Sequence, residues 1–371
     1  MRILLISTTF GRRDTRIYYR QAISLAKAGH KVTILCSDLE KEEINGNIRI
    51  ISTRKLLNSR LKRIMFTNSS IKKTLSKISY DAVQISSPES LPLIKYFKRK
   101  DKFIVFDSRE DYSAFISEKT WIPKFLRKPI SFFYKNYEKR LLSITDCVIV
   151  ITSFLRNRFQ IFHNNVCIVS NFPPLFDEIN SKLDYSNGLD LCFFGTVSED
   201  DMHYNVMEAI KNNENTRYHL LSAGNAHDNS KFLRMAKEIG VENNFFLSYK
   251  VPYEKIPQFL VNKNVGIIIR KYAANYGYRR GSLGVIKFFQ YMSAGLPIIC
   301  TDFDEWKTII DENQCGIYVN PYDVNEIKNA ILFLKDNPAV AKTMGDNAKK
   351  AFKTKYNWET QVGIYLDCFE K

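Results

Sequence analysis

The sequence predicts an α/β protein made of two Rossmann-like domains with parallel sheets. Short runs of β-branched residues alternate with stretches of helical apolar spacing along the whole chain, which is typical of parallel strands joined by helices. A chain of 371 residues is longer than one hydrophobic core usually serves. The formal net charge of +16 lies in the first half of the chain, and the second half is close to neutral. We therefore expect two domains with different partners.

The first domain is expected to open with a strand, a helix and a second strand, at Arg2–Ser7, Arg16–Gly29 and Lys31–Cys36. This order fits a nucleotide-binding half-domain. The double proline at Pro173 and Pro174 marks a linker, because proline interrupts helices and strands alike. The first domain thus covers residues 1–172. Its further strands are predicted at Asp81–Ile85, Phe103–Asp107, Cys147–Ile151 and Val166–Val169.

The second domain is expected to start again with a buried strand, at Leu189–Phe194, and to extend over residues 173–355. Further strands are predicted at Tyr218–Ser222, Asn244–Leu247, Val265–Ile269, Ile298–Cys300 and Gly316–Val319. Helices are predicted near 229–240, 253–262, 285–294, 323–336 and 338–352. Alternation of this kind indicates parallel strand pairing.

The most informative stretch is residues 265–302, which read as strand, basic loop, helix, glycine turn and strand. Arg270 ends the first strand, and ligands of open parallel sheets bind beyond the carboxyl ends of the strands. Lys287 lies in the first turn of the helix, where unpaired N–H groups and the helix dipole suit a phosphate or diphosphate. Arg279 and Arg280 in the loop either assist with that anion or are solvated surface charges.

Two segments of the chain resemble glycosyltransferase family 4. Residues 287–299, KFFQYMSAGLPII, are similar to its K-x-x-E-Y-M-x-x-G-x-P-V-I segment. Residues 14–35, DTRIYYRQAISLAKAGHKVTIL, resemble its D-x-R-I…G-H-x-V opening. The strand before Arg270 is similar to the arginine-ended strand of surface-polysaccharide members.

The resemblance implies the GT-B fold, in which two Rossmann-like domains face each other across a cleft. The first domain would hold the acceptor and the second a nucleotide-sugar donor, while the last helix, about residues 356–371, crosses back to the first domain. The implied reaction moves a sugar from a nucleoside-diphosphate sugar to a hydroxyl of a lipid-linked glycan, in the synthesis of a surface polysaccharide such as capsule or lipopolysaccharide. By resemblance, it retains the anomeric configuration.

The same resemblance assigns roles to individual residues. Lys287 and Arg270 would bind the donor diphosphate and stabilise the leaving group. Other donor contacts are expected from Gly195, Thr196, Gly224, Tyr249, Arg279, Arg280, Ser282 and Gln290.

On the acceptor side, Asp107–Asp111 resembles the family's D-x-H-E segment, with Arg109 where histidine is usual. Glu110 is the candidate for positioning the acceptor, with Arg16, Arg109 and Asp111 beside it. The alternative for these acids is a helix start that the helix dipole favours.

The chain departs from the family pattern at four donor positions. Ser282 and Gln290 stand where the family has glutamates, Thr196 stands where it has an arginine, and residues 198–204 lack the lysine that follows that arginine in the family. These departures support an alternative function, a catalytically degenerate GT-B binding subunit. A sugar-nucleotide epimerase would need acid and base carboxylates that the sequence does not show.

Two basic segments favour an anionic membrane surface as a partner. Residues Asn47–Tyr80 contain no acid, and residues Trp121–Leu142 interleave aromatic side chains with lysine and arginine. The alternative is a pair of ordinary helices with solvated basic faces. Nucleic acid is disfavoured, because no nucleic-acid-binding motif accompanies the charge. We expect a cytoplasmic protein, peripheral on the inner face of the plasma membrane.

No metal or cofactor is expected beside the nucleotide-sugar donor. The seven cysteines show no C-x-x-C spacing and most fall in or beside predicted strands, so we interpret them as reduced core residues without a zinc site. No D-x-D sequence falls in a suitable loop, and lysine and arginine would neutralise the diphosphate.

Overall fold

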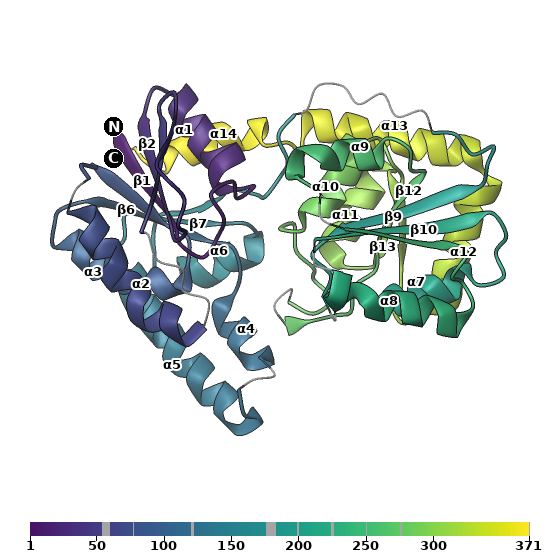
Figure 1. Cartoon of the computed structure of the whole chain (residues 1–371), viewed down its shortest axis with the longest axis horizontal. Helices are drawn as coiled ribbons and strands as arrows, with labels where there is room; N and C mark the ends of the chain where they lie inside the picture. Colours follow the sequence, from purple (N-terminus) through teal and green to yellow (C-terminus); the bar gives the residue numbers. More distant parts are fainter. Residues whose placement is uncertain are drawn as a thin grey trace. The chain divides into compact units, whose positions relative to one another are not determined.

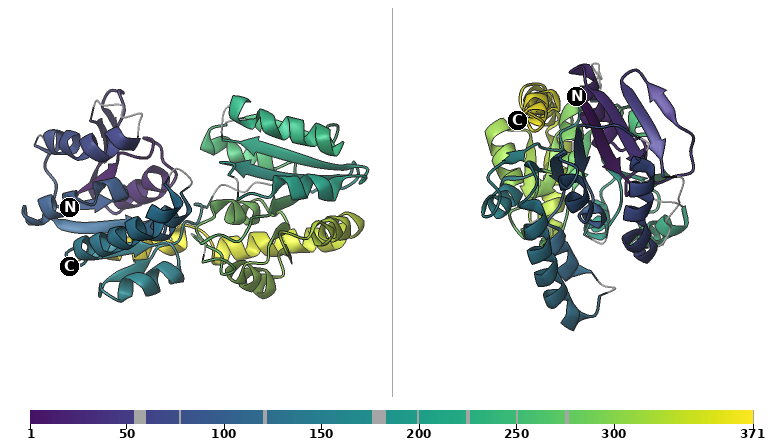
Figure 2. Two further views of the ribbon diagram at one scale, coloured as in Figure 1. Left: turned by 90° about the horizontal axis from the view of Figure 1, so that it is seen from below. Right: turned by 90° about the vertical axis from the view of Figure 1, so that its left-hand side faces the viewer.

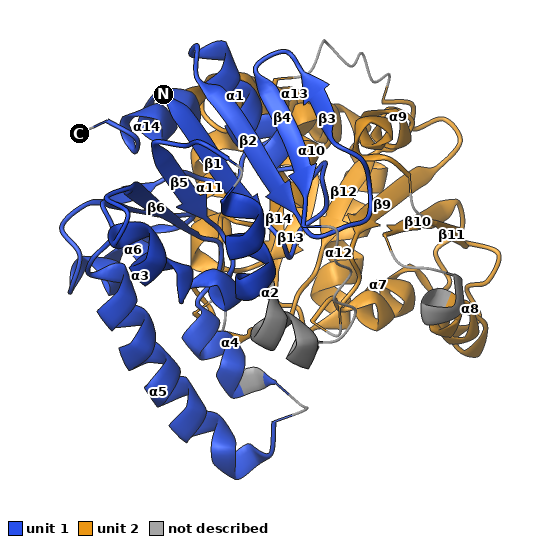
Figure 3. Ribbon diagram, turned by 60° about the vertical axis from the view of Figure 1, so that its left-hand side comes forward, with its two compact units in different colours: residues 1–174, 361–371 blue, residues 175–360 orange. Residues whose placement is uncertain are grey.

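The computed structural model describes residues 1–53, 60–76, 78–119, 122–175, 183–198, 200–223, 226–249, 251–274 and 277–370. The chain divides into two compact units, each an α/β layer structure (Figures 1 and 3). Unit 1 comprises Met1–Pro174 and Gln361–Lys371, and unit 2 comprises Leu175–Thr360. The C-terminal segment thus belongs to the unit in which the chain begins.

The sheet of unit 1 has, within the described residues, the strand order β3-β4-β2-β1-β5-β6-β7-β8. Neighbouring strands are parallel except for the edge pair β3 and β4, which is antiparallel. The strands are β1 (Arg2–Ser7), β2 (Lys31–Cys36), β3 (Glu43–Asn45), β4 (Ile48–Ser52), β5 (Ala82–Ile85), β6 (Phe103–Ser108), β7 (Cys147–Val150) and β8 (Val166–Ile168).

The first helix of unit 1 starts with a π-helical turn, η1 (Ile17–Ala22), and continues as α1 (Ile23–Lys27). The helices α4 and α5 pack against each other at one end of the unit (Figures 1 and 2). The other helices of unit 1 and the C-terminal helix are α2 (Arg60–Leu75), η2 (Pro88–Ser90), α3 (Leu93–Lys98), α4 (Tyr112–Glu118), α5 (Lys124–Leu142), α6 (Ser153–Gln160) and α14 (Glu359–Asp367).

The sheet of unit 2 is parallel in every described pairing, with the order β11-β10-β9-β12-β13-β14. Its strands are β9 (Leu189–Gly195), β10 (Thr216–Ser222), β11 (Phe245–Tyr249), β12 (Val265–Ile268), β13 (Ile298–Thr301) and β14 (Gly316–Val319). Its helices are α7 (His203–Ile210), α8 (Ala226–Ile239), η3 (Tyr253–Lys255), α9 (Ile256–Leu260), α10 (Ile286–Ser293), α11 (Asp304–Asn313), α12 (Val324–Asp336) and α13 (Pro338–Thr354).

The strands are nearly continuous apolar runs because helices cover both faces of each sheet (Figure 1). In β1, for example, every residue from Ile3 to Ile6 is at most 1% exposed. Among the described residues, no helix combines the length and apolarity that a membrane-spanning segment needs.

One glycine sets how closely α10 approaches the sheet of unit 2. A Cβ atom at Gly266 in β12 would lie 2.2 Å from Cγ of Tyr291, a residue of α10 that is fully buried. The Tyr291 hydroxyl in turn donates to the Cys192 carbonyl of β9, at 3.1 Å. Glycine at this point therefore lets α10, which carries Lys287, lie directly on two central strands.

We expect Gly266→Ala to destabilise unit 2 by about 1–3 kcal/mol, because the added methyl group overpacks the contact with Tyr291. Thermal unfolding should show the midpoint of the unit 2 transition falling by several degrees. Gly363→Ala is the matched control, since a Cβ there meets nothing within 4 Å and alanine favours a helix. Equal midpoints for the two variants would contradict the packing argument.

Candidate functional site

The candidate donor site of unit 2 lies where the strand order reverses. The first strand of this unit, β9, has β10 on one side and β12 on the other, so its carboxyl end forms the switch point of the sheet. Ligands of open α/β sheets bind at such a point. Gly195 is the last residue of β9, and Arg270 follows the end of β12. Two predicted site residues are therefore neighbours at the switch point.

Lys287 extends across the end of β9. Its Nζ atom donates to the Thr196 carbonyl at 3.4 Å and lies 4.5 Å from the centre of the Phe193 ring. Gly195 has a φ of +109°, and a Cβ atom there would lie 2.9 Å from Lys287 Cε. The backbone conformation therefore favours glycine here, and the absence of a side chain leaves room for the lysine that crosses it.

The environment of Lys287 disfavours its charge. Burial and, to a smaller extent, Arg270 lower the pKa of its ammonium group to about 8, although Asp201 acts in the opposite direction. An added anion would reverse this balance, since an opposite charge at short range favours the protonated lysine. This environment therefore favours an anionic ligand beside the Lys287 ammonium group.

Arg270 forms a compact cluster with Asp201 and Ser198. Its Nε atom lies 3.1 Å from Asp201 Oδ1, and its Nη2 atom donates to Ser198 Oγ at 3.2 Å. Asp201 Oδ2 accepts from the Ser198 N–H at 2.8 Å and from its hydroxyl at 2.9 Å. Burial alone would raise the pKa of Asp201, but Arg270 and Lys287 bring it below its ordinary value. One carboxylate thus faces two cations.

His203, at the start of α7, is a further buried residue of this site. Its Nδ1 atom forms a 2.7 Å hydrogen bond with the Tyr218 hydroxyl. Its ring meets the Phe193 ring edge-on, with 4.6 Å between the two ring centres. Burial, with Lys287 nearby, lowers the pKa of His203 to about 4, so the ring is neutral near pH 7. Its Nε2 atom has no hydrogen-bond partner among the described residues.

Gln290 lies one turn after Lys287 on α10, and hence on the same face of that helix. It is 1% exposed, and neither polar atom of its side-chain amide has a partner within the described residues. An unsatisfied buried polar group costs about 1–3 kcal/mol. Hydroxyl groups of a bound ligand would satisfy both the donor and the acceptor.

The remaining predicted donor residues lie in the loop before α10 and at strand ends. Arg279 donates to the Tyr272 hydroxyl at 3.2 Å and lies 3.5 Å from Asp302, while Arg280 lies 3.4 Å from Glu305. Their charges therefore already face acids of the β13–α11 segment. Ser282 Oγ accepts a hydrogen bond from the Gly284 N–H. The side chains of Thr196 and Tyr249 are exposed, and Gly224 lies outside the described residues.

In unit 1, Arg16 is engaged in a fully buried ion pair with Asp107. Both side chains are at most 1% exposed, and two hydrogen bonds of 2.9 Å join the guanidinium to the carboxylate. Arg16 also donates to the Val169 carbonyl at 3.0 Å. Asp107 further accepts from Gln21 at 2.8 Å. Arg16 thus joins η1 to β6 and to the end of β8, and its donors point into the protein.

Arg109 is likewise paired within unit 1. Its Nη2 atom donates to Asp14 Oδ1 at 2.8 Å, and its guanidinium lies 3.9 Å from the centre of the Phe10 ring. Burial alone would raise the pKa of Asp14, but Arg109 brings it below the ordinary value. This pair fixes the loop after β1 to the carboxyl end of β6.

Asp111 caps α4, since its carboxylate accepts from the Ala114 N–H at 3.0 Å and faces Arg158 at 3.0 Å. Arg158 also forms an ion pair with Glu138, whose pKa burial raises to about 7. The helix-start interpretation of this acid therefore agrees with its contacts.

Glu110 is the exposed member of the segment and lines a pocket of about 630 Å³ within unit 1. The wall is largely apolar, and Arg109 and Glu89 contribute the polar side with Glu110. One carboxylate oxygen of Glu89 is buried without a partner among the described residues. The apolar part of the wall includes Phe10, Phe115, Ile116, Ile122, Ile130 and Tyr134.

Sequence reasoning missed Asp201 and His203, which contact the cations or rings of the donor site. The notable signal was the acid-rich segment that follows Gly195, in which a family lysine would be expected. From the sequence alone, an acidic side chain near predicted cationic residues is most simply interpreted as a solvated surface group. Only the bridge between Asp201 and Arg270 shows that the segment turns back onto the sheet.

The fold and this site define a GT-B protein with two Rossmann-like parallel-sheet domains. A family model described as "Glycosyl transferases group 1" matches residues 177–351, and one described as "Glycosyltransferase Family 4" matches residues 15–172. The chain therefore belongs to glycosyltransferase family 4, a family of nucleotide-sugar-dependent glycosyltransferases. The predicted family and the predicted pair of Rossmann-like parallel-sheet domains are confirmed.

Known proteins similar to this chain agree with that assignment. An uncharacterized glycosyltransferase of Methanocaldococcus jannaschii is 23% identical over 74% of this chain and 69% of its own length. Sucrose-phosphate synthase of Thermosynechococcus elongatus superposes with a TM-score of 0.78 at 16% identity, over 100% of this chain and 99% of that one. WaaG, a glycosyltransferase involved in lipopolysaccharide biosynthesis, superposes with a TM-score of 0.71 at 12% identity, over 100% of both chains.

We expect Arg16→Met to destabilise unit 1 by about 3–5 kcal/mol, because it leaves the buried Asp107 carboxylate without its hydrogen-bonded counter-charge. Denaturant unfolding would measure the loss. Arg2→Met is the matched control, since the Arg2–Asp81 pair is solvent-exposed and its loss should change stability far less. The double variant Arg16→Met/Asp107→Leu should recover much of the loss, and an Arg16→Met effect no larger than the control would contradict the structural role.

Proposed function

We propose that this chain transfers a sugar from a nucleoside-diphosphate sugar to a hydroxyl of a lipid-linked glycan, with retention, in the synthesis of a surface polysaccharide. The observation that carries the proposal is the pair of cations at the switch point of unit 2, the partly exposed Lys287 and the buried Arg270. Lys287 and Arg270 there share one carboxylate, Asp201, so the cluster has an excess of positive charge.

In this proposal the two cations receive the donor diphosphate. The leaving diphosphate gains negative charge as the sugar departs, so cations held in place before the reaction stabilise the transition state more than the ground state. They would perform the neutralisation that a metal ion performs in other transferases, and we propose that the reaction needs neither metal nor cofactor. Gln290 would bind hydroxyls of the donor with its two unpaired amide atoms.

The contacts of Arg279 and Arg280 change how we assign them. Both lie beside acids, Asp302 and Glu305, and their side chains are 65% and 38% exposed. We therefore propose that they hold the loop before α10 in place, and that the diphosphate depends mainly on Lys287 and Arg270.

We propose that the pocket of unit 1 takes the acceptor. Its apolar wall suits the lipid portion next to the sugar, and Glu110 and Glu89 offer carboxylate oxygens to the acceptor hydroxyls. Glu110 would position the acceptor. Arg16, Arg109 and Asp111 would support this site from behind, through the ion pairs that each already makes.

The membrane part of the proposal rests on α5, because part of Asn47–Tyr80 and Trp121 lie outside the described residues. The helix exposes Phe125, Phe132 and Phe133 by 78%, 64% and 71%. Lysines and arginines occur throughout the same helix, and no acid other than the buried Glu138 does. Aromatic rings surrounded by cations suit the headgroup region of an anionic bilayer. We propose a cytoplasmic location on the inner face of the plasma membrane.

The first test is a thermal-shift and product-release screen of UDP-, GDP-, dTDP-, ADP- and CMP-sugars. One base class should stabilise the wild type and release its nucleotide slowly. Lys287→Ala should weaken that binding about 10–100-fold, since it removes a charge-assisted contact. Lys342→Ala is the control, because Lys342 pairs with Asp346 on the exposed surface of α13 and should bind normally. No shift with any donor would instead favour the catalytically degenerate binding subunit.

The lowered pKa of Lys287 predicts that donor affinity depends on pH. The Lys287 pKa of about 8 belongs to the free protein, and a bound diphosphate raises it. Donor affinity should therefore be constant below about pH 7.5 and fall by up to about tenfold per pH unit above pH 8. Lys287→Arg should bind without this decline, since guanidinium stays charged. Calorimetry would measure the donor affinity at each pH, since the donor diphosphate keeps its charge over this range. Parallel curves of affinity against pH for the wild type and Lys287→Arg would contradict the prediction.

For the membrane, we expect Phe132→Ser/Phe133→Ser to weaken binding to phosphatidylcholine vesicles with about one-quarter phosphatidylglycerol by tenfold or more. Vesicle sedimentation would measure this. Ile161→Ser is the control, because Ile161 is 79% exposed but lies outside α5. Wild-type binding should also weaken as salt rises. Equal binding to neutral and anionic vesicles would contradict an electrostatic contribution.

A further inference from the structure

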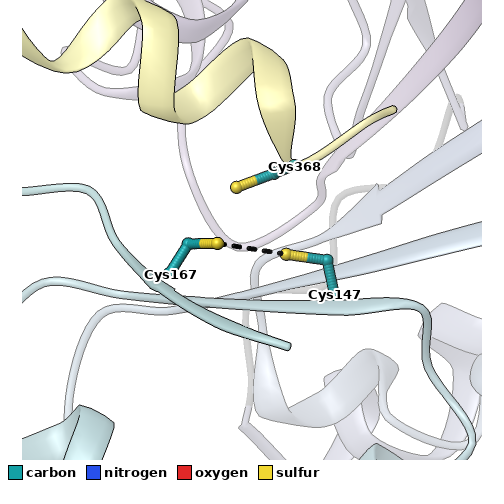
Figure 4. A group of neighbouring side chains, drawn as sticks. All are labelled: Cys147, Cys167 and Cys368. Atoms are coloured by element: carbon teal, nitrogen blue, oxygen red, sulfur yellow. Dashed lines mark hydrogen bonds between the residues drawn. The ribbon is translucent and has the colours of Figure 1, made fainter. Parts of the chain in front are cut away.

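Three cysteines that are far apart in the chain converge in unit 1. Cys147 is the first residue of β7, Cys167 lies in β8, and Cys368 directly follows α14 (Figure 4). Their Sγ atoms all lie within 4.8 Å of one another, and those of Cys147 and Cys167 are 4.0 Å apart. The sequence showed no metal-binding spacing here, because each thiol comes from a separate element.

The separation of the sulfur atoms suits a metal ion better than a disulfide. Around one ion with Zn–S bonds of about 2.3 Å, ligand sulfurs lie about 3.8–4.0 Å apart. The three thiols therefore need to move by less than about 1 Å to share an ion. A disulfide bond of about 2.05 Å would require two of them to close by about 2 Å and would leave the third thiol unused.

The surroundings provide an entry path and polar neighbours. Cys147 and Cys368 are buried, whereas Cys167 is partly exposed, so an ion can reach the cluster past one thiol. The Cys167 thiol donates to the Asn165 side-chain oxygen at 3.6 Å, and the Cys368 thiol donates to the Ile364 carbonyl at 3.2 Å.

We propose that Cys147, Cys167 and Cys368 together bind one thiophilic d¹⁰ cation such as Zn²⁺. On binding, the coordinating thiols give up their protons to solvent and three thiolates hold the ion, with water or Asn165 at the remaining position. Soft thiolate ligands select such cations over Mg²⁺ or Ca²⁺. This site is separate from the donor cluster, which lies in unit 2.

The cluster has a structural consequence for the C-terminal helix. Besides these sulfurs, the Tyr365 hydroxyl of α14 donates to Gln84 of β5 at 2.8 Å, and Gln361 of α14 accepts from the Ser170 N–H, which follows β8, at 2.9 Å. An ion shared by Cys368 and two strand cysteines would fasten the end of this helix to β7 and β8. The metal thus acts as an anchor for the segment that returns to unit 1.

The test uses the full chain, reduced and stripped of metal with a chelator. Titration with Zn²⁺ against a chromophoric chelator should show one tight equivalent, and Co²⁺ should give a thiolate charge-transfer band in the near ultraviolet. Cys167→Ser, the least buried position, should weaken Zn²⁺ binding by about 100-fold or more and reduce that band. Cys36→Ser is the control, a buried thiol of β2, and should bind Zn²⁺ like the wild type.

Thermal unfolding separates a lost site from a lost fold. Zn²⁺ should raise the midpoint of the wild type and of Cys36→Ser but not that of Cys167→Ser, while the metal-free proteins should have similar midpoints. Three results would overturn the proposal: no saturable Zn²⁺ uptake, equal uptake by the triple serine variant, or a disulfide in the isolated protein that leaves two of the seven thiols unreactive until reduced.

Discussion

The carboxyl ends of parallel strands all lie at one edge of a sheet, and the candidate sites of both units follow from this constraint. In unit 2 it brings Gly195 of β9 beside Arg270, although 74 residues separate them in the chain. In unit 1 it brings the loop after β1 to Arg109, which follows β6. Loops can vary at such an edge while the strands below keep their register, so reactive groups gather there without disturbing the core.

Buried charges are compensated differently in the two units, and the difference separates structure from function. In unit 1, Arg16 and Asp107 satisfy each other with two hydrogen bonds and are closed to solvent. In unit 2, Asp201 faces both Arg270 and Lys287, and the lysine keeps a lowered pKa. A paired buried charge specifies a fold, whereas a cation held against its own desolvation cost gains free energy when an anion arrives.

Much of the fold was predictable from the sequence, because buried parallel strands are continuous apolar runs. The strands β1, β2, β9, β12 and β13 were all expected at nearly their observed positions, and the glycine after α10 marked the helix end. The antiparallel pair β3 and β4 was not expected, since Ile48–Ser52 falls in a basic stretch that was interpreted as a membrane-facing segment. The pair is a short local hairpin, with only Gly46 and Asn47 between its strands, and the basic composition of the stretch that begins at Asn47 concealed it.

The site was predictable only in part. Lys287 and Arg270 could be placed by a motif and a strand end, yet Asp201, which faces both, lies in a segment without a recognisable pattern. The three-cysteine cluster could not be predicted either, because β7, β8 and α14 are separate segments of the sequence that come together only in the folded protein. Arg16 matched a family opening, and only its burial shows that its donors point inward.

The departures from the family pattern are better understood together than one by one. At the donor site the family's arginine and nearby lysine are missing, with Thr196 at the arginine position, and its two glutamates are replaced by Ser282 and Gln290. Two positive and two negative groups of the family pattern are thus absent from one site. Arg270, Lys287 and Asp201 still carry one net positive charge toward the ligand. Binding of a diphosphate depends on that balance, and Gln290 keeps the hydrogen-bonding capacity toward ligand hydroxyls that the glutamate would supply. Under the proposed assignment, the substitutions would therefore alter which donor sugar fits more than whether a nucleoside diphosphate binds.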